Sequence, residues 1–303
     1  MQRTAPANMT AVSAGIACYL IWGFVPLYFQ AVAHAGPGSW EILAHRIAWS
    51  VPAAALFVAM AHQGRQVAAV FRQPRVLGWL LASAVLIAIN WVVFIWAVNS
   101  GHVLESSLGY YINPLVNMAA GALIFRERID RVGQAAIALA VVGVLLQTIA
   151  VGHLPLASLA LALSFGSYGI VRKQVAADAQ TGLLVECLLL APPSLAYIAW
   201  LQASGAGHFG DPAAAAWLIV SGPVTAIPLV LFAWAARRIP LSAMGFLQFT
   251  GPTIGFVIGV AQGEALTPLR MASFVFIWGA AAVFVWGAWH RSRAVAAAAA
   301  MAE

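Results

Sequence analysis

Residues 105–117 read E-S-S-L-G-Y-Y-I-N-P-L-V-N. They place a carboxylate, two tyrosines, two asparagines, a glycine and a proline inside a chain that is otherwise strongly apolar. Each unpaired polar atom in hydrocarbon costs several kcal/mol, so such groups persist only where they face protein or a water-filled cavity. The stretch therefore predicts a helix that lines a site or anchors a bundle.

The composition around this stretch is that of an integral membrane protein. Hydrophobic residues make up 63% of the 303 residues and charged residues 8%, whereas soluble domains carry about 25% charge. The apolar runs are each about 20 residues long, enough to cross roughly 30 Å of hydrocarbon as helices. The net charge of +6 comes from arginines clustered between these runs without interleaved aromatic residues. We therefore expect a lipid bilayer as the partner and no nucleic acid.

We predict an all-α, polytopic fold with ten transmembrane helices. The predicted spans are about 10–33, 40–60, 76–99, 104–125, 133–151, 155–173, 182–201, 214–236, 242–262 and 270–290. If the N-terminus is inside, 13 of the 15 lysines and arginines fall on the inner side, as expected because cytoplasmic loops retain positive charge. We therefore expect both termini to be cytoplasmic, with residues 291–303 as a short tail.

Matching residues recur in two halves of the chain, residues 10–151 and 155–290. The offsets are 138, 137 and 136 residues for the pairs Pro114 and Pro252, Glu127 and Glu264, and Gly143 and Gly279. Because each half holds five predicted helices, an odd number, the second half enters the membrane from the opposite side. Inverted five-helix repeats are typical of secondary transporters, which bind substrate near the midplane between the halves.

The matched prolines are candidates for breaks in two helices that bind substrate. Pro114 frees the carbonyl of Tyr110, and Pro252 frees that of Gln248. Discontinuous helices at corresponding positions indicate a transport site; the alternative is that each proline only kinks its helix. The candidate substrate-binding residues in these two segments are Tyr110, Tyr111, Asn113, Pro114, Gln248 and Pro252.

Arg46 lies within the second predicted helix, where a cation must be paired, bound to backbone carbonyls or open to water. It is either half of a structural ion pair or a ligand for a substrate carboxylate or phosphate, which a guanidinium binds bidentately. Glu41 and His45, four residues apart beside it, share a helical face. Glu186, 141 residues after His45, could complement it from the other half.

Proton-coupled transport would need a group that changes charge. The candidates for such a charge relay are Glu105, Glu41, His45 and Glu186. Glu105 has two interpretations. It is either a solvated cap, since a carboxylate favours a helix N-terminus, or a protonatable group at an outer vestibule with His102 or Asn99 as partner.

The third predicted helix carries Asn90, Trp91 and Trp96. Trp91 lies well inside the span, so it either packs in the core or lines a cavity for an amphipathic or aromatic ligand. Tyr168 is a similar candidate. No H-E-x-x-H helix, paired-cysteine metal site, phosphate-binding loop or G-x-S-x-G elbow is present, so we predict no enzyme activity, metal or cofactor.

Six runs of sequence together indicate a family. They are E-I-L-A-H-R from Glu41, N-W-V-V-F-I-W-A-V-N from Asn90, L-E-S-S-L-G-Y-Y-I-N-P-L-V-N from Leu104, F-G-S-Y-G-I-V-R-K from Phe165, A-Q-T-G-L-L-V-E from Ala179 and G-F-L-Q-F-T-G-P-T from Gly245. With these runs the chain resembles the RarD proteins of the EamA branch of the drug/metabolite transporter superfamily. The likeness runs from about residue 10 to 290.

This resemblance implies a ten-helix transporter of the bacterial inner membrane, with inverted repeats around a central cavity. Relatives of this kind export amino acids and other metabolites. The resemblance also implies structural roles for Glu127 and Glu264, as caps or as partners of loop arginines. We expect an exporter, secondary active or facilitative, of small polar or amphipathic metabolites, amino-acid-like or drug-like, that works by alternating access. The competing class is a non-transporting sensor or assembly factor that keeps the bundle.

Overall fold

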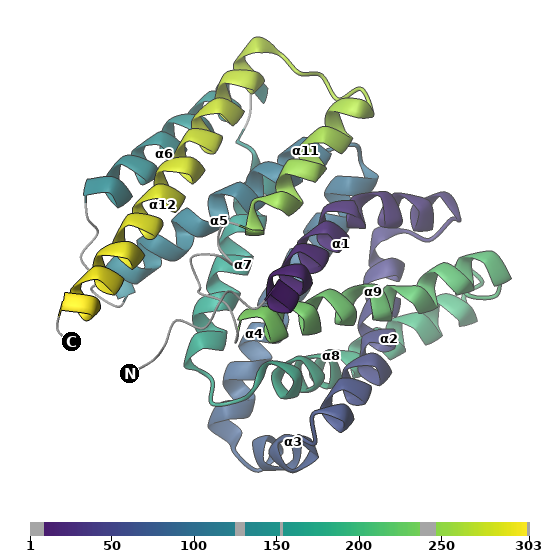
Figure 1. The fold of residues 1–303 in the computed structure, drawn as a ribbon. Helices are drawn as coiled ribbons and strands as arrows, with labels where there is room; N and C mark the ends of the chain where they lie inside the picture. The colour runs from purple at the N-terminus through teal and green to yellow at the C-terminus, as the bar shows by residue number, and fades with distance from the viewer. Residues whose placement is uncertain (1–8, 125–130, 152–153, 237–246, 302–303) are drawn as a thin grey trace.

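The computed structural model describes residues 9–124, 131–151, 154–236 and 247–301, and every regular element in these ranges is an α-helix (Figure 1). The helices are α1 (Met9–His34), α2 (Ser39–Met60), α3 (Gly64–Phe71), α4 (Pro74–Asn99), α5 (Val103–Ile124), α6 (Arg131–Val151), α7 (Leu156–Gln174), α8 (Ala179–Ala203), α9 (Pro212–Ala236), α11 (Thr250–Ala261) and α12 (Pro268–Met301). The predicted all-α class is confirmed.

Seven of the described helices are long and apolar enough to cross a bilayer: α1, α2, α4, α6, α8, α9 and α12. The shorter apolar helices are Leu156–Arg172 and Thr250–Ala261. On α4 the exposed side chains Leu81, Val85 and Ile89 follow one another at a spacing of four, so they form an apolar stripe on one helical face. Such a surface belongs in lipid, and the protein is a multi-pass membrane protein.

The predicted end of the last span differs from the one observed, and the predicted ninth span lies partly outside the described residues. α12 continues to Met301, so most of the expected tail after residue 290 is helical. The predicted ninth span, 242–262, falls partly on residues 237–246, which lie outside the described ranges. Within those ranges, α11 begins at Thr250, directly after a turn at Phe249. Glu127 also lies outside the described ranges.

Helices from the two halves of the sequence interleave instead of forming separate domains. α1 packs against α9 and α11, whereas α7 packs against α4 and α5. α2 contacts both α8 and α9, and α6 runs beside α12 at the left of Figure 1. The core is therefore shared by both halves.

The largest core cluster forms where α1, α2, α4, α7 and α9 meet. Five large side chains in it are fully buried: Phe29, Ile42, Ile95, Leu161 and Leu218. Lipid tails are as apolar as these side chains, so close packing holds such a cluster together. α9 and α2 approach each other closely at Gly222, where a Cβ would lie 2.1 Å from the carbonyl oxygen of Trp49. Gly222 lies about one turn before Thr225.

One helix, α3, lies where the sequence predicts only a connection between two spans. α3 joins the ends of α2 and α4 and lies at the bottom of Figure 1. Val67 and Val70 point inward from α3 and pack with Leu80 and Val185, which belong to α4 and α8. Val67 and Val70 lie about one helical turn apart, and these two contacts are enough to anchor the short helix α3.

Candidate functional site

Arg46 lies among the side chains of the largest core cluster and is 8% exposed. Its Nε donates a hydrogen bond to Oγ1 of Thr225 on α9, at 2.8 Å. Its guanidinium carbon lies 4.2 Å from the ring centroid of Trp91 and 5.2 Å from that of Phe29. The Thr225 hydroxyl itself donates to the carbonyl of Ser221 at 2.9 Å. Four helices, α1, α2, α4 and α9, thus converge on one cation.

No carboxylate pairs with Arg46 in the part of the chain that the structure describes, where the ion pairs join Arg172 to Glu186 and His208 to Glu41. Nor do its terminal nitrogens, Nη1 and Nη2, hydrogen-bond to any described residue. Burying a charge is costly unless it is paired. A desolvated cation–π contact contributes about 2 kcal/mol, which offsets only part of the cost of burying this charge. The arrangement can therefore bind an anion.

Tyr110 and Asn90 form a polar bridge beside this cation, linking α5, α4 and α7. The Tyr110 hydroxyl donates to Oδ1 of Asn90 at 3.0 Å, and Nδ2 of Asn90 donates to Oγ of Ser164 at 3.1 Å. Tyr110 also packs against the largest core cluster, which contains Trp91 and Phe29. Four predicted substrate-binding residues, Arg46, Trp91, Asn90 and Tyr110, are thus brought together.

Tyr111 belongs to a different cluster, because successive residues of a helix point about 100° apart. Its hydroxyl shares a hydrogen bond with Oγ1 of Thr253, and its ring stacks on Phe249 with centroids 6.1 Å apart. Asn113 is fully buried, and neither atom of its amide finds a hydrogen-bond partner among the described residues. Tyr111 therefore contacts Thr253 in α11 and the preceding Phe249, and it does not belong to the residues around Arg46.

The predicted break at Pro114 is absent, since α5 is one continuous helix from Val103 to Ile124. The side chain of Pro114 is outside those described. In the second half the interruption precedes the proline: Phe249 forms a turn, and Pro252 is buried in the first turn of α11. Gln248, directly before that turn, is half-buried.

Glu186 lies near the start of α8 in a buried polar cluster. Its Oε1 accepts from Oγ of Ser83 at 2.5 Å and lies 3.5 Å from Nε of Arg172, while its Oε2 accepts from the Tyr168 hydroxyl at 3.3 Å. The guanidinium of Arg172 lies so close to Gly182 that a Cβ there would be 2.0 Å from Nη1. Tyr168, a predicted substrate-binding residue, is therefore a partner of Glu186.

Glu41 and His45 face the connection between α8 and α9. Glu41 accepts from the backbone N–H of His208 at 2.7 Å, and its second oxygen lies 2.7 Å from Nδ1 of the same residue. The ring of His45 stacks on Phe209 at 4.8 Å, and neither of its nitrogens hydrogen-bonds to a described residue. The complement to His45 in the structure is therefore Phe209 and not Glu186.

Glu105 is 5% exposed and is therefore not a solvated cap. The cap of α5 is Glu264, whose Oε1 accepts from the backbone N–H of Val103 at 2.6 Å and of Leu104 at 3.2 Å. Burial raises the pKa of the Glu264 carboxyl, and these N–H groups oppose the rise. The capping role expected for Glu264 is thus observed, and it joins the two halves of the chain.

Trp96 lies apart from these clusters. It is 48% exposed and stacks on His102 with ring centroids 5.4 Å apart.

Sequence reasoning missed several partners of the polar clusters, namely Phe29, Ser83, Arg172, Thr225 and His208. Within the described residues, no group of three or more His, Cys, Asp or Glu could hold a metal ion.

Comparisons with known proteins agree on one family. The profile of the EamA-like transporter family matches residues 9–149. Protein RarD of Salmonella typhi is 43% identical over 285 residues, covering 93% of this chain and 96% of its own. An uncharacterized transporter of Vibrio cholerae is 40% identical over 275 residues, 89% of each chain. Chloramphenicol-sensitive protein RarD of Pseudomonas aeruginosa is 30% identical over 253 residues, 82% of this chain and 85% of its own.

A solved protein structure shares the fold, with a TM-score of 0.59 over 90% of this chain and 96% of its own, at 16% sequence identity. The matching family model and the Vibrio cholerae relative are both named as transporters. Together with the seven apolar helices, they make this protein a multi-pass transporter of a bacterial inner membrane that acts on a small molecule. The chain therefore belongs to the EamA-like transporter family, as a RarD-like member of the drug/metabolite transporter superfamily.

Proposed function

We propose that the protein exports a small metabolite with a carboxylate group, amino-acid-like or drug-like, as a secondary active or facilitative transporter. The observation that carries this proposal is Arg46, a cation buried among aromatic rings without a carboxylate partner in the described part of the chain. Its two terminal nitrogens suit bidentate binding of a carboxylate. The apolar part of the same molecule would lie against Trp91 and Phe29.

The contacts between helices support a ten-helix architecture of two inverted halves, residues 10–151 and 155–290. We match α1, α2, α4, α5 and α6 with α7, α8, α9, α11 and α12, in that order. The contacts of α1 with α9 and α11 then mirror those of α7 with α4 and α5. The pairs α2–α8, α5–α11 and α6–α12 each join a helix to its counterpart, as a two-fold relation requires. The bond from Arg46 to Thr225 crosses between the halves, where such transporters bind substrate.

Alternating access requires that the two ends of the pathway open in turn. Two polar clusters near opposite ends of α8 are suited to this role. The bond from Glu41 to His208 holds α2 to the segment after α8, and the pair of Arg172 with Glu186 holds α7 to the start of α8. With cytoplasmic termini, the first would close the outer end and the second the inner end.

Proton coupling is assigned to Glu186 in this mechanism, because its protonation would remove the ion pair with Arg172. Glu186→Gln in proteoliposomes should then make transport independent of pH. Glu105, Glu41 and His45 are the alternatives, each tested by its own neutral variant. If transport keeps its pH dependence in all of these variants, coupling does not run through this set of residues.

The carboxylate proposal is tested by thermal unfolding of the purified protein with a panel of metabolites and their amides. A ligand at 100 times its Kd stabilises the folded state by about 2.7 kcal/mol. The carboxylate form should raise the melting temperature more than the amide, which lacks the charge that Arg46 would bind. Equal shifts from a carboxylate and its amide would refute the proposal.

Variants then locate the ligand. Arg46→Gln should lose the shift, and Arg46→Lys should keep part of it, since lysine retains the charge but not the planar fork. The control is Arg270→Gln, which removes an arginine in the first turn of α12, away from Arg46. This variant should show the same ligand-induced shift as the wild type. Efflux of the same ligand from preloaded proteoliposomes should follow the binding data. A carboxylate shift that survives Arg46→Gln would place the ligand elsewhere.

A further inference from the structure

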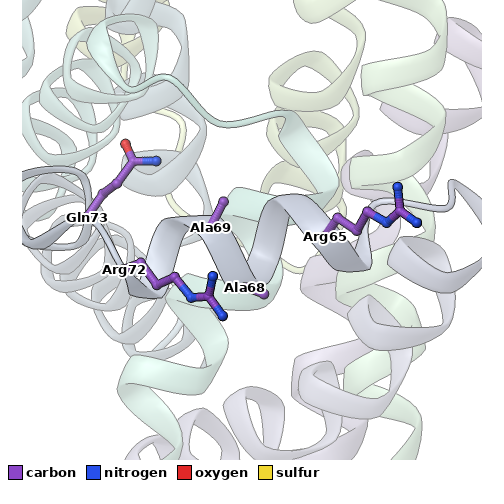
Figure 2. Close-up of a pocket in the computed structure, with 5 residues that line it drawn as sticks. All are labelled: Arg65, Ala68, Ala69, Arg72 and Gln73. Carbon is purple, nitrogen blue, oxygen red and sulfur yellow. The ribbon is translucent and has the colours of Figure 1, made fainter.

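A hollow of about 440 Å³ lies on α3, at the end of the bundle that the charge distribution predicts to be cytoplasmic. Its lining residues are Arg65, Ala68, Ala69, Arg72 and Gln73. Positions 65, 68, 69 and 72 follow the spacing of one helical face. Figure 2 shows the two arginines toward either end of α3 with the alanines between them. The short alanine side chains leave the space between the two guanidinium groups open.

In the described part of the chain, neither of these two arginines has an anionic partner. The ion pairs of the described ranges involve other residues, and the side chain of neither Arg65 nor Arg72 hydrogen-bonds to a described residue. Both side chains are exposed. They are seven residues apart, or about 10.5 Å along a helix axis, so two flexible side chains can converge on one phosphate through charge-assisted hydrogen bonds.

The opposite side of α3 is apolar and fixed to the bundle. Val70 is 2% exposed and packs with Leu80 and Val185. Next to it Phe71 is 46% exposed, and Trp79, at the start of α4, is 42% exposed. A helix with a basic outer face and apolar residues beneath it is typical of the membrane interface, where tryptophan is also enriched. α3 would therefore lie at the level of the lipid headgroups.

We propose that this hollow binds the headgroup phosphate of an anionic phospholipid, such as phosphatidylglycerol, from the cytoplasmic leaflet. The two arginines supply the charge complementary to the phosphodiester. Phe71 and Trp79 supply an apolar surface for the acyl chains, which a soluble phosphate would not use. Because α3 packs on α4 and α8, a bound lipid would hold together the ends of the helices that carry Ser83 and Glu186.

Lipid titration of the purified full-length protein in neutral detergent tests the proposal, with bound lipid counted by native mass spectrometry. The probes are phosphatidylglycerol, phosphatidylcholine and glycerol phosphate. Phosphatidylglycerol should bind more tightly than phosphatidylcholine, and glycerol phosphate should not displace it. The double variant Arg65→Gln/Arg72→Gln should bind phosphatidylglycerol about thirtyfold more weakly, the effect of two cations near a membrane surface.

The matched control is Arg75→Gln/Arg293→Gln, which removes the same charge from exposed positions outside the hollow and should keep the wild-type affinity. Ala69→Glu is a second test, because its carboxylate would pair with the arginines and displace the lipid while both cations remain. Equal loss in the control and test pairs, or no preference for phosphatidylglycerol, would overturn the proposal. Displacement by glycerol phosphate would show a site for soluble phosphate instead.

Discussion

Replacing Gly222 with alanine should separate α2 from α9 and destabilise the protein. A Cβ at this position would lie 2.1 Å from the carbonyl oxygen of Trp49 and 2.4 Å from its carbonyl carbon. Ordinary contact begins at 3.4 Å, so the two backbones would have to move apart by about 1.3 Å. Because the obstacle is backbone, no change of rotamer can relieve it.

The size of the effect follows from three contributions. Overpacking of a tight interface costs about 1–3 kcal/mol. The bond from Arg46 to Thr225, one turn from this contact, lengthens as the helices separate, and a hydrogen bond to a charged group contributes about 1.5–3 kcal/mol. Alanine regains about 1 kcal/mol of helix propensity over glycine. The expected net loss in the free energy of unfolding is about 1.5–5 kcal/mol.

Thermal unfolding in detergent provides the assay, with Gly279→Ala on α12 as the matched control. At that position a Cβ would meet only a side-chain atom of Leu139, at 4.0 Å, so the substitution should be neutral or stabilising. Gly222→Ala should also weaken carboxylate binding, because it displaces Arg46. If Gly222→Ala unfolds at or above the melting temperature of Gly279→Ala, the close contact does not hold this interface as reasoned.

Three further substitutions test the polar groups. Thr225→Val removes the acceptor of the Arg46 Nε–H and should lower the free energy of unfolding by about 1.5–3 kcal/mol in chemical denaturation. Tyr110→Phe leaves Oδ1 of Asn90 without this donor and should cost about 1–3 kcal/mol in the same assay. Glu264 has a raised pKa in the folded protein, so its carboxyl favours folding below the unfolded value of 4.5. That contribution is lost as the pH rises through the folded pKa. Melting curves of Glu264→Gln from acid to neutral pH should therefore lose this component of the pH dependence.

Seven of the predicted spans coincide with helices long and apolar enough to cross a bilayer, because the bilayer itself sets their length and apolar composition. α3 was missed because only two of its positions, Val67 and Val70, point into the bundle, which is too few for a periodic pattern. The end of α12 was misplaced because hydropathy ends a span where the apolar run ends. An alanine-rich helix can continue beyond that point, since alanine has the highest intrinsic helix propensity.

The site was predicted only in part, because sequence places residues along a helix but does not say which helix they will contact. Tyr110 and Tyr111 are neighbours in the sequence and were predicted to share a site, yet they face different clusters. Thr225 carried no signal, because a threonine in an apolar run often bonds the carbonyl four residues before it. Thr225 does so here, and it also accepts the bond from Arg46.

Among the buried charged groups of the described residues, Arg46 is the one whose charge a bound anion would balance. Glu186 and Glu41 each have a basic side chain beside them, and Glu105 lies in the first turn of α5, where the helix dipole favours a carboxylate. Arg46 has one hydroxyl and two aromatic faces instead. A neutral side chain of similar volume would avoid the desolvation cost of this cation. Stability alone therefore does not explain an arginine at this position, whereas the proposed anionic ligand, entering and leaving, would.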